Sequence, residues 1–67
     1  MITINTKKIK EMMTERRMYC SDLAKHVGVS VYTIYKIIDN GYPPTWEDLC
    51  RIASVFGCTP NDLIIKE

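Results

Sequence analysis

The 67-residue sequence lacks an apolar run of the length that a membrane span requires. Residues 1–5 also lack the basic stretch followed by an apolar run that marks a signal peptide. We therefore expect a cytoplasmic protein without a membrane association. Because the chain is short and 46% hydrophobic, we expect a single domain over residues 1–67 in which every helix contributes to the core.

Residues that carry metal and enzyme chemistry are also scarce. Three cysteines, Cys20, Cys50 and Cys58, lack the CxxC or Cys/His spacing of a metal site or disulfide framework, and His26 is the one histidine. Reduced thiols are the expected state. No carboxylate pair, His/Cys couple or glycine-rich phosphate loop stands out, so we expect no enzyme, no cofactor and no small-molecule ligand.

Net charge is low, at +1, which at first argues against a nucleic-acid partner. The charges are unevenly distributed, however. Residues 1–41 hold seven basic and four acidic side chains, a net of +3, whereas residues 42–67 hold two basic and four acidic ones, a net of −2. The basic half could face phosphates, or its charges could form an ordinary solvated surface.

The most informative stretch is residues 20–41, CSDLAKHVGVSVYTIYKIIDNG, which divides at Gly28. The apolar residues before the glycine lie on one face of a short helix: Leu23, Ala24 and Val27. Those after it do the same: Ile34, Ile37 and Ile38. Gly28 can end the first helix in a left-handed conformation, and Ser30 can cap the second. This pattern predicts two short helices joined by a tight turn, a helix-turn-helix.

The stretch resembles the Cro and phage-repressor (Xre-type) helix-turn-helix family. The matching positions are Leu23, Ala24, Val27, Gly28, Val29, Ser30, Thr33, Ile34 and Ile37. The resemblance covers nearly the whole chain, since residues 43–64 are similar to the fourth and fifth helices of that family. It implies an all-α, compact five-helix lambda-repressor-like DNA-binding domain, in which helices two and three form the motif.

Local signals give approximate boundaries. We expect an extended lead-in with Ile2 and Ile4 against the body, helix one at about residues 6–16, and helix three from residue 31 to about 39. A fourth helix should start after Thr45, and a last helix after Thr59. No strand of consequence is expected. Trp46 and Phe56 are expected in the core.

Three positions depart from the family pattern. Arg17 stands where relatives usually have a helix-ending glycine, so the end of helix one could be strained. Tyr19 replaces a hydroxyl cap, although Asp22 can still accept the N–H of that residue. Many relatives have a buried arginine and glutamate where this chain has Met13 and Ile38, so we predict that these two apolar side chains touch each other instead of an ion pair.

If the isoleucines of helix three face inward, its opposite face presents Val31, Tyr32, Tyr35 and Lys36 to DNA bases. Ser30 and Thr33 are expected to touch phosphate near the helix N-terminus. The resemblance adds Asn40 and Tyr42, in a loop that meets the DNA backbone, and Cys20, which replaces a glutamine that commonly contacts DNA. The alternative for the exposed tyrosines is a protein-binding patch.

The function implied is a sequence-specific transcriptional regulator, of the phage or mobile-element repressor type, that binds double-stranded DNA as a homodimer on a palindromic operator. Three consecutive apolar residues near the end of the chain exceed what one helix face can bury, so Ile64 and Ile65 are the candidate dimer interface. The alternative is a protein-interaction module such as the antitoxin of a toxin–antitoxin pair.

Overall fold

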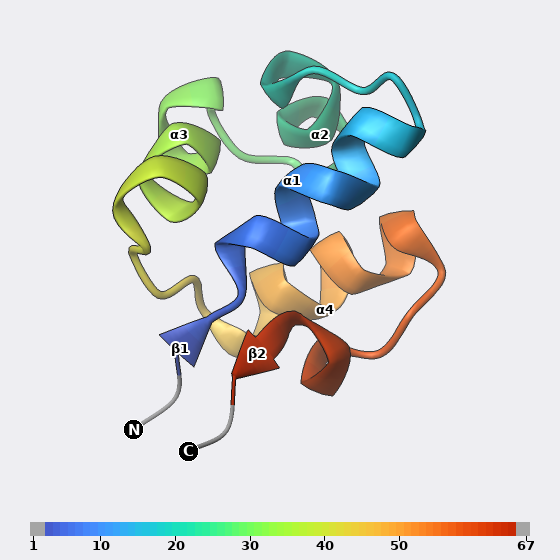
Figure 1. The fold of residues 1–67 in the computed structure, drawn as a ribbon. Coiled ribbons are helices and arrows are strands. Elements are labelled where there is room, and N and C mark those ends of the chain that lie inside the picture. Colours follow the sequence, from blue (N-terminus) through green and yellow to red (C-terminus); the bar gives the residue numbers. More distant parts are fainter. Residues whose placement is uncertain (1–2, 66–67) are drawn as a thin grey trace.

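Four α-helices and a short two-stranded ribbon make up residues 3–65, the part of the chain that this computed structural model describes. The helices are α1 (Thr6–Glu15), α2 (Cys20–Val27), α3 (Val31–Asn40) and α4 (Trp46–Phe56). The strands are β1 (Thr3–Ile4) and β2 (Ile64–Ile65), and a 3₁₀-helix, η1 (Pro60–Leu63), precedes β2. Figure 1 shows α2 and α3 at one end of the molecule and the ribbon at the other, with α1 and α4 between them.

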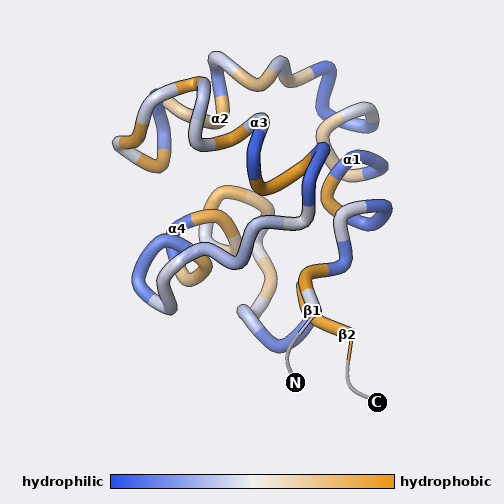
Figure 2. The backbone as a smooth tube through the Cα atoms, turned by 90° about the vertical axis from the view of Figure 1, so that its left-hand side faces the viewer, coloured by the Kyte–Doolittle hydropathy of each residue, from blue (hydrophilic) through white to orange (hydrophobic). Residues whose placement is uncertain are grey.

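The hydrophobic core is built from one stripe of each helix. Its buried members are Ile4, Ile9, Met13, Leu23, Ala24, Val27, Ile34, Ile37, Ile38, Leu49, Ile52, Ala53, Phe56 and Leu63. Figure 2 shows hydrophobic and hydrophilic stretches alternating along the helices, as amphipathic helices around a common core require. The predicted inward stripes are therefore confirmed, including Ile4 in the lead-in; Ile2 lies outside the described residues.

Side-chain caps fix where the helices begin. Asn5 accepts the backbone N–H of Lys8 at the start of α1, at 3.1 Å between Oδ1 and N. Thr45 does the same for α4, where its Oγ1 lies 3.2 Å from the backbone nitrogen of Asp48. Tyr19 cannot cap with a short hydroxyl, and its own N–H donates to the Asp22 carboxylate at 3.0 Å, as predicted. These bonds satisfy backbone donors that the first helical turn leaves without a partner.

The end of the chain differs from the prediction of a fifth α-helix. Thr59 and Asp62 form the expected start, with the Thr59 N–H donating to the Asp62 carboxylate at 3.0 Å, but only one 3₁₀ turn follows. The backbone then extends as β2, pairing antiparallel with β1 so that Thr3 faces Ile65. So short a helix gains little from its own hydrogen bonds, and the lead-in strand offers better partners. The expectation of no strand of consequence missed this short ribbon, whose strands have 2 residues each.

Arg17 has a left-handed backbone, with φ of 52°. It is the non-glycine residue with positive φ in the described chain, and it lies just after α1, where relatives usually place glycine. The backbone N–H of Met18 then donates to the carbonyl of Met13 at 2.9 Å, which closes the helix end. A Cβ disfavours this conformation, so strain at residue 17 stays a prediction with a stated physical cause.

Two aromatic predictions have different outcomes. Phe56 is buried, and the Arg16 guanidinium lies 5.3 Å from its ring centroid, joining the ends of α1 and α4. Trp46 is 57% exposed, so its expected core position was wrong. It is the first residue of α4, ahead of the buried stripe that begins at Leu49.

Met13 and Ile38 are both buried, and they line one shallow hollow between α1 and α3. Apolar side chains thus occupy the place where the resemblance implies an ion pair. Direct contact between the two stays a prediction.

Candidate nucleic-acid interface

The exposed face of α3 follows from its buried one. Ile34, Ile37 and Ile38 are buried, and the helical repeat then turns Val31, Tyr32 and Tyr35 to the surface. Tyr32 is 69% exposed and Tyr35 49%. The outward face predicted from the isoleucine spacing is therefore present.

The turn between α2 and α3 sets the position of this face. Gly28 adopts φ of 86° and ends α2, and its N–H donates to the carbonyl of Ala24 at 2.8 Å. Ser30 begins α3, where its Oγ accepts the backbone N–H of Thr33 at 3.2 Å and lies 3.0 Å from the Thr33 hydroxyl. Ser30 is exposed and Thr33 half-buried, so both lie beside the N-terminal turn of α3. The positive end of a helix dipole favours an anion there.

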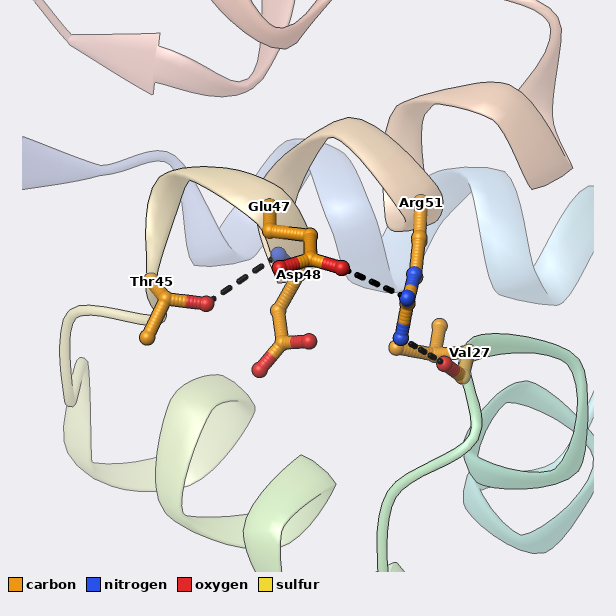
Figure 3. Close-up of polar contacts among 5 residues, drawn as sticks. All are labelled: Val27, Thr45, Glu47, Asp48 and Arg51. Carbon is orange, nitrogen blue, oxygen red and sulfur yellow. Dashed lines mark hydrogen bonds and ion pairs between the residues drawn. The ribbon is translucent and has the colours of Figure 1, made fainter.

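Arg51 ties the motif to α4. Its guanidinium donates to the carbonyl of Val27, at the end of α2, over 3.4 Å and pairs with Glu47 at 2.6 Å (Figure 3). The positive charge lies where the negative end of the α2 dipole attracts it. Sequence reasoning missed this role, although Glu47 and Arg51 have the i, i+4 spacing of a helical ion pair.

Lys36 is half-buried, and two tyrosine rings lie within cation–π distance of its ammonium group. Its Nζ is 4.2 Å from the ring centroid of Tyr42 and 5.6 Å from that of Tyr32. The structure therefore brings together three of the predicted DNA-contacting side chains. The involvement of Tyr42 could not be seen from the helix periodicity, because this residue lies in the loop beyond α3.

A negative charge also lies on α3. Asp39 is exposed near the end of the helix, and Lys10 of α1 approaches it at 3.8 Å between Nζ and Oδ1. This contact offsets part of the repulsion that Asp39 would exert on a phosphate. Next to it, Asn40 is exposed as the last residue of α3.

Cys20 is the first residue of α2. It is half-buried and lines the hollow between α1 and α3, together with Met18 and Ile38. Burial and the nearby Asp39 carboxylate raise the pKa of its thiol. At neutral pH the group is therefore a thiol, which donates only weakly.

The two candidate dimer residues lie on β2, at the end of the molecule opposite α2 and α3 (Figure 1). Ile65 is 40% exposed on β2, while Ile64 is half-buried against the core. Among residues 3–65 no cluster of three or more His, Cys, Asp or Glu side chains could hold a metal ion. No helix in the described range is both long and apolar enough to span a membrane.

Two short helices joined by Gly28, Val29 and Ser30, with the second presenting its outer face, define a helix-turn-helix domain. The model of the Cro/C1-type HTH DNA-binding domain family matches residues 8–67, and the chain belongs to this family. The family predicted from the sequence is thus confirmed. A comparison with curated proteins finds no match. Membership supports a sequence-specific DNA-binding regulator, and domains of this family generally bind rather than catalyse.

Proposed function

We propose that the protein is a transcriptional repressor of the phage or mobile-element type, which binds a palindromic operator as a homodimer. The observation that carries this proposal is the outward face of α3, where Val31, Tyr32 and Tyr35 are exposed on a helix whose other side is buried. A helix held in this way can enter the major groove with its N-terminal turns. Such a regulator would act in the cytoplasm.

The side chains divide by what they can contact. Val31 and the rings of Tyr32 and Tyr35 suit thymine methyl groups, and each tyrosine hydroxyl can also donate or accept a hydrogen bond at a base edge. Lys36 can donate to guanine acceptors.

Backbone contacts come from both ends of α3. Ser30 and Thr33 lie at its N-terminus, where hydroxyls and backbone N–H groups suit phosphate. Asn40 and Tyr42, at its C-terminal end, would meet the DNA backbone on the far side. We expect Cys20 to contribute least to DNA binding, because a half-buried neutral thiol is a weak hydrogen-bond donor.

A homodimer is the expected binding unit because one small domain makes few phosphate contacts. Two copies would place their α3 helices on half-sites about 34–36 Å apart. Ile65, with Ile64 beside it, supplies an exposed apolar edge for this contact, at the end of the molecule away from α2. Sedimentation velocity tests this: Ile65→Lys should convert a dimer to a monomer, whereas Tyr19→Lys, on a tyrosine at the other end that is more exposed than Ile65, should not.

Gel-shift titration tests the function itself. DNA recovered from a random pool should bind more tightly than scrambled DNA of the same length, and the advantage should persist as salt weakens both. Equal binding of recovered and scrambled DNA at every salt concentration would contradict sequence-specific regulation.

A protein-interaction module, such as an antitoxin, is the second candidate. The observation that favours it is the number of exposed aromatic side chains, because aromatic residues are common anchors of protein interfaces. These are Tyr19, Tyr32, Tyr35, Tyr42 and Trp46. Stoichiometric co-purification with a protein encoded next to it, lost on Trp46→Ala but retained in Tyr35→Ala, would favour this function over DNA reading by α3.

A further inference from the structure

Lys36 is the one cation among the residues of α3, and its position is set by two aromatic rings. The Nζ lies 4.2 Å from the ring centroid of Tyr42 and 5.6 Å from that of Tyr32. Both distances fall within the range of a cation–π contact, in which the negative face of a ring attracts an ammonium group. Both rings are exposed, so this arrangement lies on the surface rather than in the core.

The backbone explains why the rings meet at this one side chain. Tyr32 precedes Lys36 by one helical turn, and side chains four residues apart are neighbours on a helix surface. Tyr42 arrives from the other direction. Gly41 adopts φ of 66°, which turns the chain back, and the N–H groups of Gly41 and Tyr42 both donate to the carbonyl of Lys36. The Lys36 carbonyl thus accepts the hydrogen bonds that turn the loop, and the Lys36 ammonium lies over the ring of Tyr42 from that loop.

This arrangement reduces the side-chain conformational entropy that Lys36 loses when it binds DNA. A free lysine side chain samples many rotamers, and fixing it on binding weakens the complex. Each exposed cation–π contact is worth about two- to fivefold in an equilibrium constant. Two such contacts order the ammonium before DNA arrives, and its N–H donors remain available on the side that neither ring covers.

We propose that Tyr42 and Tyr32 are positioning residues that hold the Lys36 ammonium for a guanine, whose O6 and N7 acceptors face the major groove. The inference rests on the proposed function, because it assigns a base to the exposed face of α3. A phosphate contact does not require such ordering, since a lysine on a flexible stem reaches a phosphate oxygen from many rotamers. A base edge offers its acceptors at one place only.

The free protein provides a test that needs no DNA. Ring currents should shift the ε-methylene protons of Lys36 upfield in the NMR spectrum. Tyr42→Phe keeps the ring and should keep the shift, whereas Tyr42→Leu should remove most of it. Unshifted ε-methylene protons in the unmodified protein would overturn the held geometry, whatever the protein binds.

A double-mutant cycle with DNA tests the role. On the site recovered from a random pool, Lys36→Met should lower the preference for guanine at one position of each half-site about tenfold. Tyr42→Leu should lower that same preference about two- to fivefold. Tyr42→Phe keeps the ring and should retain the preference, although loss of the hydroxyl's contact with the DNA backbone would weaken binding to all sequences alike. In the Lys36→Met background, Tyr42→Leu should cause no further loss, because its effect passes through the lysine.

Three results would overturn the proposal. If Tyr42→Phe lowers the guanine preference as much as Tyr42→Leu does, the ring is not what holds the ammonium. If Tyr42→Leu has its full effect without Lys36, the ring acts independently of the ammonium. If Lys36→Met weakens all sequences equally and reduces the salt slope by about one, Lys36 contacts a phosphate. Failure to recover any preferred DNA would instead reject the proposed function. The NMR test would still show whether the two rings hold the Lys36 ammonium.

Discussion

Replacing Arg17 with glycine should stabilise the protein, although it removes a charged side chain. Arg17 has φ of 52° just after α1, in a region where a Cβ costs an L-residue roughly 1–2 kcal/mol. Glycine avoids this cost but loses more backbone freedom on folding, which offsets about 0.5–1 kcal/mol. The expected net gain in the free energy of unfolding is therefore about 0.5–1 kcal/mol from the backbone.

Arg17→Ala is the matched control. It removes the same charge, which near the C-terminus of a helix can be worth about 0.3–1 kcal/mol, and it keeps the Cβ. Comparing the two variants therefore isolates the backbone effect, and the glycine variant should exceed the alanine variant by about 0.5–1 kcal/mol.

Urea unfolding followed by circular dichroism measures this difference, provided that the slope with denaturant is the same for both proteins. In a domain of this size the glycine variant should unfold about 4 °C above the alanine variant. Equal stability of the two variants, or a less stable glycine variant, would refute the claim that the backbone at residue 17 is strained.

Two further predictions concern contacts that hold the motif and the chain end. Arg51→Met removes both the bond to the Val27 carbonyl and the ion pair with Glu47. It should therefore lower the free energy of unfolding, measured by thermal melts, by about 1 kcal/mol, and Glu47→Gln should lower it by less. An equal loss in the two variants would contradict a role for the carbonyl bond. Hydrogen bonds from the Thr59 N–H and hydroxyl lower the pKa of Asp62 below its ordinary value, so its carboxylate stabilises the fold above that value, and the contribution is lost as pH falls through the lowered pKa. Asp62→Asn should accordingly lower the melting temperature at neutral pH but much less at pH values near 2, and a difference that is independent of pH would count against this bond.

The parts of the fold that could be predicted from the sequence are those that local chemistry decides. The spacing of Ile34, Ile37 and Ile38 fixes the buried face of α3, and Ser30 and Gly28 mark the ends of the turn before it. Each of these signals lies within one helical turn of the feature it predicts. The outer face of the helix then follows by geometry alone.

The parts that could not be predicted depend on distant partners. Residues 64–65 become a strand because β1, at the other end of the chain, supplies the hydrogen bonds. Trp46 lies three residues before Leu49, the same spacing that separates Leu49 from the buried Ile52. It is nevertheless exposed, because it lies at the first position of α4. The contact of Tyr42 with Lys36 requires the loop path after Gly41, which no helical periodicity describes. Local patterns thus predicted the exposed face of α3 but not that Tyr42 would pack against it from outside the helix.

Base preference in Tyr35→Ala tests the central claim, that the outer face of α3 contacts DNA bases. Tyr35 is 49% exposed, so its replacement should leave the melting temperature nearly unchanged. The account predicts that parallel selections from one random pool give the same half-site spacing for both proteins, with preference lost in the variant at one base pair of each half-site. An identical consensus sequence for the two proteins would contradict base contact by Tyr35 and the orientation of α3 proposed for the complex.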